Sequence, residues 1–278
     1  MIVKRKISTQ YVKQGAFWGA LLFACTYASA KDCKFTAASF SGGLIDSRWQ
    51  EFSATGQFLL EEKGTLIAER LNLEAFCFGT EWHVDWSQAR GQRHYAGLTN
   101  KQQAATTTTD IQDESVNVGF MLPLNNFWSA GIGLERRDTY RNIRSTDKAS
   151  GYPERFKELT GLAGLRYKVL ISENTNLAAS IWVGESIDGR VWLGLPNADP
   201  TTLTLGKGSI QEATLTWSRK TSSQSKWFWA YTVHWRSTDK DAGPATALKR
   251  NDRLIGSAVQ PRTTTQSFGF NARIGYLF

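Results

Sequence analysis

Four side chains of this sequence have the types and spacing that could support catalysis. Glu81, His83 and Asp85 alternate with two tryptophans and a valine, and His234 lies in a second alternating stretch. Side chains two apart in a strand point to the same face, so the first three are expected together. A histidine beside a carboxylate can act as a general base that activates water. These four residues are therefore weak catalytic candidates for a hydrolase, and the alternative for each histidine is a hydrogen-bonded structural role.

The end of the chain shows what kind of element would position them. Phe268, Phe270, Tyr276 and Phe278 fall on one face of an unbroken alternation, with mostly polar residues between them. This period-two pattern predicts a strand with one apolar face. The ending resembles the C-terminal assembly signal of Gram-negative outer-membrane β-barrels. The resemblance implies insertion into the outer membrane, among its lipids, by the barrel assembly machinery.

Similar alternation recurs through the chain. A membrane barrel needs segments of about ten residues that alternate lipid-facing and lumen-facing side chains, because no backbone hydrogen bond can be left open in the bilayer. Glu185 interrupts one segment, as a bulge or an exit from the membrane would, and a tight turn is expected at 62–64. Besides the C-terminal segment, the candidates are 52–61, 65–75, 80–88, 114–122, 127–141, 156–169, 176–190, 211–219 and 226–237.

The predicted fold is therefore all-β, a transmembrane antiparallel up-and-down β-barrel of ten strands. Twelve strands are the alternative, if residues 35–43 add one strand and a long loop adds another. Connections near 76–79, 123–126, 172–176 and 221–226 are short and expected in the periplasm, whereas those near 89–113, 142–154, 192–207 and 239–261 are long and expected outside the cell.

The first thirty residues are typical of a secretory signal peptide. They combine four basic residues, an apolar stretch over 16–24 and the sequence Ala28-Ser29-Ala30. A lipoprotein signal ending at Cys25 is the alternative. Cleavage near Ala30 divides the chain into a signal peptide, 1–30, and an outer-membrane barrel domain, 31–278. It also lowers the net charge from +8 to +4, so the basic composition does not predict a nucleic-acid partner.

Two cysteines remain after this cleavage. Cys33 and Cys77 both fall on the expected periplasmic side, where the oxidising compartment permits a disulfide between them. The sequence does not fix the distance that such a bond requires. Two cysteines without a nearby histidine do not predict a metal site, and no cofactor motif is found.

The inward positions of the predicted strands are rich in charge. The interior of a ten-stranded barrel is narrow enough for side chains to fill, and buried charges must be paired. We interpret them as a lumenal ion-pair network that keeps the barrel closed; the alternative is a constricted pore with charge selectivity. Besides the catalytic candidates, the network is predicted to include Arg70, Glu74, Glu135, Arg137, Glu158, Arg166, Asp188, Arg190, Glu212, Arg236 and Arg273.

Arginines also concentrate on one predicted extracellular hairpin. Arg136, Arg141 and Arg144 are candidate contacts for the phosphates of lipopolysaccharide, because a guanidinium group can bind phosphate through two hydrogen bonds. The alternative is a basic loop that is simply solvated.

Length and strand number resemble the omptin proteases, which use aspartate and histidine pairs at the extracellular mouth of a ten-stranded barrel. The resemblance covers size and layout, and the omptin catalytic residues are missing: segment 192–207 holds Asp199 but no histidine. Outer-membrane phospholipases place a histidine and a serine two apart on one face, whereas His234 and Ser237 are three apart.

The leading hypothesis is therefore a non-enzymatic outer-membrane barrel with a charge-filled lumen and extracellular loops that interact with surface partners. The alternatives are a small-solute, porin-like channel and a surface hydrolase of omptin-like layout.

Overall fold

The computed structural model describes residues 33–98, 104–147 and 149–278. The predicted signal peptide lies outside these residues. Among those described, no helix is long and apolar enough to cross a membrane. The strands are β1 (Cys33–Phe52), β2 (Phe58–Cys77), β3 (Thr80–Leu98), β4 (Ala104–Pro123), β5 (Trp128–Ile143), β6 (Pro153–Ser172), β7 (Thr175–Leu193), β8 (Thr201–Thr204), β9 (Gly208–Lys220), β10 (Trp227–Lys240), β11 (Thr246–Arg250), β12 (Arg253–Ala258) and β13 (Arg262–Leu277).

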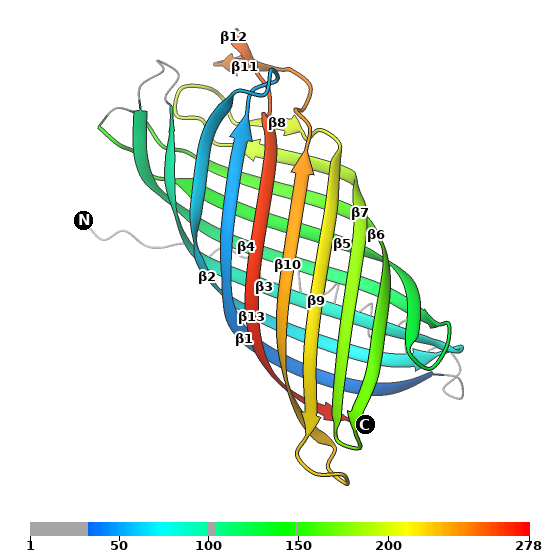
Figure 1. Cartoon of the computed structure of the whole chain (residues 1–278). Helices are drawn as coiled ribbons and strands as arrows, with labels where there is room; N and C mark the ends of the chain where they lie inside the picture. Colours follow the sequence, from blue (N-terminus) through cyan, green and yellow to red (C-terminus); the bar gives the residue numbers. More distant parts are fainter. Residues whose placement is uncertain (1–32, 99–103, 148) are drawn as a thin grey trace, which may run out of the picture.

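Ten of these strands close into a barrel in which all neighbours are antiparallel. Strands β1 to β7 pair in sequence order, β7 pairs with β9, β9 with β10 and β10 with β13. Strand β13 then pairs with β1 and closes the barrel, as Figure 1 shows for the red and blue strands. The predicted ten-stranded up-and-down barrel is confirmed. The alternative of twelve is not, because residues 35–43 form part of β1.

An apolar belt surrounds the outside of the barrel. Outward side chains such as Leu44, Ile67, Ile132, Ile181 and Phe270 expose 49–66% of their surface. A continuous exposed apolar surface of this kind suits contact with lipid tails rather than water. The alternation read from the sequence produces this belt, because every second residue of a strand faces outward.

Aromatic pairs lie on the outer surface near the ends of strands that meet at the short turns. The rings of Trp128 and Tyr167 lie 5.0 Å apart between centroids, and those of Trp227 and Tyr276 lie 5.2 Å apart. Tryptophan and tyrosine are enriched where lipid headgroups meet water, because their rings are apolar and their tips polar. These pairs therefore border the apolar belt.

The first two strands differ from the prediction. Segment 52–61 is not one strand, because β1 ends at Phe52 and β2 begins at Phe58. The turn expected at 62–64 was also wrong, since these residues lie inside β2. Gly64 does not mark a turn: a Cβ atom there would lie 2.2 Å from the carbonyl oxygen of Gln92. Glycine is needed at this position because two strands approach closely.

Strand β7 contains the irregularity that Glu185 signalled. Thr160 pairs with Ser186, whereas the preceding Leu159 pairs with Asp188, so Ile187 is an extra residue in β7. A β-bulge of this kind reverses which side chains face inward beyond it. Before the bulge, the even-numbered residues such as Gly184 and Ser186 face the lumen. After it, the odd-numbered residues such as the buried Val191 and Leu193 do.

The long connections hold more structure than expected. Most of 89–113 is strand, because β3 continues to Leu98 and β4 begins at Ala104. The connection after β7 contains β8, which pairs with the end of β7. The connection after β10 forms the hairpin β11–β12, which projects beyond the barrel in Figure 1. The turn of this hairpin is held by Asp199. Its carboxylate accepts hydrogen bonds from the backbone N–H groups of Asn251 and Asp252, each at 3.2 Å.

Cys33 and Cys77 lie at the other end of the barrel, in paired positions of β1 and β2. The structure joins them in a disulfide, with their Cα atoms 4.2 Å apart. The covalent link ties the start of β1 to the end of β2 beside the short turn that leads to β3.

Candidate functional site: the barrel lumen

An apolar cluster, here called the mouth core, fills the lumen at the end opposite the short turns. Phe156 exposes 2% of its surface, Val191 0% and Leu203 1%. Strands β7 and β8 bring their apolar side chains against residues from the facing wall of the barrel. The mouth core consists of Trp49, Leu60, Phe156, Val191, Leu193, Leu203 and Leu205.

A group of buried charges, here called the mouth cluster, lies against this core. It comprises Glu51, Glu62, Arg93, Arg141 and Glu154, and Arg141 is completely buried. Arg141 donates to Glu154 at 2.6 Å, to Glu62 at 2.8 Å and to Glu51 at 3.3 Å. One guanidinium thus joins β1 and β2 to β5 across the lumen, and it also pairs with the neighbouring strand β6.

Further contacts fix the position of Arg141. Its guanidinium carbon lies 4.4 Å from the ring centroid of Trp49, and the indole N–H of Trp49 donates to Glu51 at 2.9 Å. The hydroxyl of Thr109 donates to Glu62 at 2.6 Å. A planar, always charged guanidinium suits such a site because it can stack on an aromatic ring and donate in several directions.

The mouth cluster lies beyond the apolar belt, since the outer wall at this height is polar. Arg155, which follows Glu154, faces outward and forms a two-bond ion pair with Asp138, at 2.8 Å for each bond. Inside, burial raises the pKa of Glu154 to about 7, with Glu51 and Glu62 adding to the rise and Arg141 opposing it. Burial also acts to raise the pKa of Glu62, but Arg141, Arg93 and Thr109 together outweigh it and the pKa is lowered.

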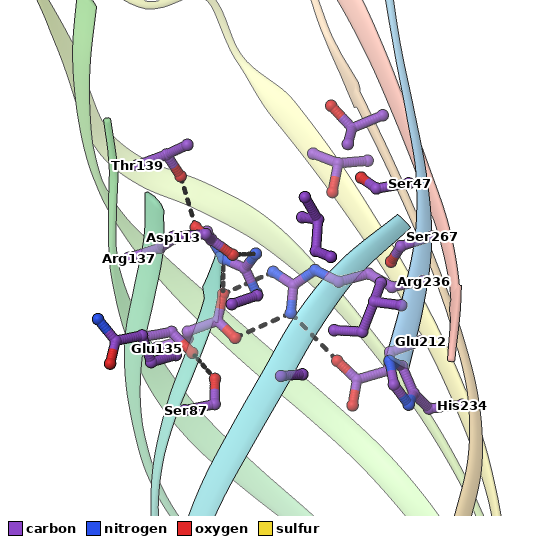
Figure 2. A pocket seen from close by; sticks show the side chains of 18 of the residues that line it. Ser47, Ser87, Asp113, Glu135, Arg137, Thr139, Glu212, His234, Arg236 and Ser267 are labelled. Atoms are coloured by element: carbon purple, nitrogen blue, oxygen red, sulfur yellow. Dashed lines mark hydrogen bonds and ion pairs between the residues drawn. The ribbon is translucent and has the colours of Figure 1, made fainter. Parts of the chain in front are cut away.

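Below the mouth core lies a layer of ion pairs, some crossing the lumen and some joining neighbouring strands, and we call it the central layer. Arg236 donates to both carboxylate oxygens of Glu135, at 2.5 and 2.8 Å, and to Glu212 at 3.1 Å. Arg137 donates to Asp113 at 2.8 Å, and Lys240 pairs with Glu158. Figure 2 shows Arg236 of β10 reaching Glu135 on the facing wall and Glu212 on the neighbouring strand β9, beside a small cavity of about 160 Å³.

The four catalytic candidates all face the lumen but do not form a catalytic group. Glu81 pairs with Arg166, and Asp85 accepts hydrogen bonds from Arg70 and Asn72 at 2.9 Å each. His83 packs edge-on against Trp182, with ring centroids 5.8 Å apart. His234 contacts the Asn271 side-chain amide at 3.3 Å. Neither histidine contacts a carboxylate within the described residues.

The rest of the lumen towards the short turns is open. A cavity of about 400 Å³, here called the vestibule, reaches residues near the ends of β1, β2 and β13, including Thr36, Phe76 and Leu277. Arg70, Asp85 and Glu212 line it on the side of the central layer. Of the predicted network, Glu74, Arg166 and Arg273 also line this cavity.

Three of the predicted placements were wrong. Asp188 and Arg190 lie outside the barrel, with side chains 60% and 68% exposed, because the bulge at Ile187 reverses the faces of β7. Arg141, expected to contact lipopolysaccharide, is buried in the mouth cluster instead. Arg136 does face outward, and Arg144 is exposed and pairs with Asp110 at 2.8 Å.

An outward cleft lies just above the apolar belt, over strands β3 to β7, with a volume of about 980 Å³. Tyr140 pairs across strands with Arg155, Arg155 with Trp192, and Lys157 with Arg190. Lys157 has no ion pair within the described residues, and Arg190 has only a 3.8 Å contact with Asp188. We call the five residues on its β5–β7 side, Tyr140, Arg155, Lys157, Arg190 and Trp192, the outer cleft; the carboxylates Glu114 and Asp138 also line the cavity, and Asp138 is paired with Arg155.

The sequence reading missed the mouth core and most of the mouth cluster. Glu62 lies in the segment expected to form a turn, and no motif in the sequence singles out Glu51 or Glu154. One usable signal was present, because Trp49, Glu51, Leu60 and Glu62 keep the spacing of two that continues the inward faces of β1 and β2. The burial of Leu203 and Leu205 depends on how a long connection folds back, and no local pattern reveals that.

No protein-family model matches this chain, and no curated protein matches it. Solved structures with similar folds include the outer membrane protease OmpT of Escherichia coli, at TM-score 0.57 and 11% identity, covering 90% of this chain and 98% of that one. The translocator domain of autotransporter NalP from Neisseria meningitidis aligns at TM-score 0.45 and 10% identity, over 96% and 97%. Neisserial surface protein A aligns at TM-score 0.37 and 8% identity, over 87% and 99%.

At 11% identity, the similarity to OmpT shows a common fold and nothing about activity. The chain has the fold of Gram-negative outer-membrane β-barrels, with ten strands. This fold and the apolar belt support a location in the outer membrane.

Proposed function

We propose that this protein is a closed outer-membrane barrel that works through its extracellular surface rather than by passing solutes or by catalysis. The observation that carries the proposal is the packed mouth: the mouth core and the completely buried Arg141 occupy the lumen where a solute would enter. A channel needs a water-filled path, and here both the apolar core and the central layer cross that path.

The lumen supports the same proposal from its chemistry. Ion pairs that cross between facing walls hold the strands together, and the candidate histidines lie apart from the carboxylates that would activate them. The extracellular end, by contrast, presents an ordered hairpin, β11–β12, anchored by Asp199. Such a rigid base with projecting connections is the usual layout for recognition by loops.

A solute-flux assay tests the closed barrel. Liposomes containing the purified protein are placed in solutions of small sugars, and swelling is followed by light scattering. We expect the same slow swelling as in protein-free liposomes. Swelling that depends on sugar size and on protein content would instead favour the channel alternative.

We further propose that the outer cleft contacts the phosphorylated headgroup of lipopolysaccharide. Lys157 and Arg190 are exposed cations at headgroup height, directly above the apolar belt, and Tyr140 and Trp192 offer flat rings for sugar. Each basic residue near an anionic lipid surface contributes about 1 kcal/mol of attraction. The exposed Arg136 and Arg144 are additional contacts in this proposal, whereas Arg141 is buried and cannot reach the headgroup.

Lipid retention tests this contact. The double variant Lys157→Gln/Arg190→Gln is purified in mild detergent, and bound lipopolysaccharide per barrel is quantified by mass spectrometry. Retention should fall several-fold relative to the matched double variant Arg48→Gln/Lys63→Gln, which removes two exposed cations elsewhere. Equal retention in the two variants would contradict the assignment.

A further inference from the structure

The vestibule contains a cation that the protein itself leaves unpaired. Arg273 on β13 lines the vestibule, is partly buried, and has no hydrogen bond or ion pair among the described residues. Its electrostatic neighbours are the cation Arg70, which repels it, and the carboxylates Asp85 and Glu74. Asp85 is already engaged by Arg70. Partial burial of an unpaired charge is unfavourable, so this position invites an anionic ligand.

A second arginine in the same cavity has an unused donor. Arg166 pairs with Glu81 through its terminal nitrogen, but its buried Nε has no hydrogen-bond partner. An unsatisfied buried donor is costly, and in native proteins it calls for an explanation such as a bound ion or ligand. The vestibule therefore offers donors from β6 and from β13.

The wall between these strands supplies hydroxyl groups. Ser180 and Thr214 lie 2.7 Å apart between their oxygens, and Thr216 and Thr232 lie 3.0 Å apart. In each pair one hydroxyl donates to the other, so the second keeps a proton that it can donate elsewhere. All four line the vestibule. Spare hydroxyl donors beside guanidinium groups suit the oxygens of an oxyanion.

The lining holds as many Arg and Lys as Asp and Glu side chains, four of each, but the groups left without an ion pair favour an anion. Among the described carboxylates that line the vestibule, Glu81, Asp85 and Glu212 are each paired with an arginine. Glu74 is left as a carboxylate without an ion pair, against two cations without one, Arg273 and Lys168. The unpaired groups therefore carry a net positive charge.

We propose that the vestibule is a binding site for a small oxyanion of the phosphate type, entered from the short-turn end of the barrel, which the fold places in the periplasm. This inference is separate from the proposed outer cleft, which lies outside the barrel. Because the central layer and the mouth core lie beyond it, the vestibule is a dead end. An anion that enters is held there rather than transported.

The test uses the purified barrel in detergent and inorganic phosphate as the probe, at constant ionic strength set by chloride. Isothermal titration should show saturable binding at one site. Arg273→Gln should weaken it roughly tenfold or more, because a charge-assisted hydrogen bond is lost, and Arg273→Lys should retain part of the affinity. The Lys157→Gln/Arg190→Gln variant should bind phosphate as the wild type does.

Folding of each variant is checked by its heat-dependent shift in electrophoresis. If Arg273→Gln does not fold, Thr216→Val serves instead and should weaken phosphate binding by a few fold through loss of one hydroxyl. No saturable phosphate binding to the wild type, or equal binding by wild type and the folded variant, would overturn the proposal. A loss of binding in the Lys157→Gln/Arg190→Gln variant would also overturn it, because the phosphate would then sit in the outer cleft.

Discussion

The two ends of the lumen handle buried charge in different ways. At the mouth, Arg141 is completely buried and contacts three glutamates, while aromatic and aliphatic side chains pack around it. In the vestibule, Arg273 has no ion pair within the described residues and lines an open cavity of about 400 Å³. A charge in a dry core must be matched by protein groups, whereas a charge beside an open cavity can be matched by water or by a dissolved anion. The mouth is therefore packed shut, whereas the vestibule is open to small solutes.

Removal of Arg141 should lower the stability of the barrel more than any other change proposed here. Arg141→Met leaves Glu51, Glu62 and Glu154 buried with only Arg93 nearby, and breaking a buried ion pair in this way costs about 3–5 kcal/mol. The midpoint of urea unfolding in detergent, followed by tryptophan fluorescence, should fall accordingly. Arg144→Met is the matched control, since its exposed pair with Asp110 should contribute little. Similar midpoints for both variants would show that the mouth cluster does not hold the barrel closed.

Truncation of the mouth core should have the next largest effect. Leu203 is 1% exposed, and Leu203→Ala removes packing that β8 supplies from the folded-back connection. A buried leucine replaced by alanine costs about 2–5 kcal/mol, depending on how far the site collapses. Leu254→Ala, on the exposed hairpin β11–β12, is the control with little expected change. An unfolding midpoint unaffected by Leu203→Ala would mean that β8 does not pack in the mouth.

The pH dependence of stability separates the two ends further. The pKa of Glu154 is about 7 in the folded protein against an ordinary value of 4.5. Between these values the folded state holds a proton that the unfolded state has lost, so stability should fall as pH rises from about 5 to 7. The expected loss is on the order of 1–3 kcal/mol. The lowered pKa of Glu62 acts in the opposite sense but below this window.

Glu154→Gln should remove most of this dependence, because the amide cannot ionise. Glu61→Gln, which alters a carboxylate on the outer face paired with Arg48, should leave the pH profile as in the wild type. Urea midpoints measured at intervals between pH 5 and 8 give the comparison. A wild-type profile that is flat, or that rises over this range, would contradict the role of Glu154.

The sequence was sufficient to predict the barrel, because period-two alternation and the aromatic ending are local patterns. Strand number, outward faces and the lumen placement of residues such as Glu135 and Arg236 follow from it. The turn predicted at 62–64 was wrong for a physical reason. Gly64 and its charged neighbours are typical of a turn, yet Gly64 permits the close approach of β3, and Glu62 is a buried partner of Arg141.

Other errors came from non-local structure. A single extra residue, Ile187, moves Asp188 and Arg190 from lumen to surface. Arg141 could not be told from an exposed loop arginine, because two of its three carboxylate partners, Glu51 and Glu62, come from strands distant in sequence. The unpaired state of Arg273 likewise depends on which neighbours the closed barrel places around it.

Single-channel conductance tests the contrast between mouth and vestibule most directly. The wild type is compared in planar bilayers with a mouth variant, Phe156→Ala/Leu203→Ala/Arg236→Ala, which truncates side chains of both the mouth core and the central layer, and with a vestibule variant, Thr216→Ala/Arg273→Gln. We predict no open steps for the wild type and the vestibule variant, and small open steps for the mouth variant, in which both obstructions are reduced. Reproducible open steps in the wild type would contradict the closed mouth.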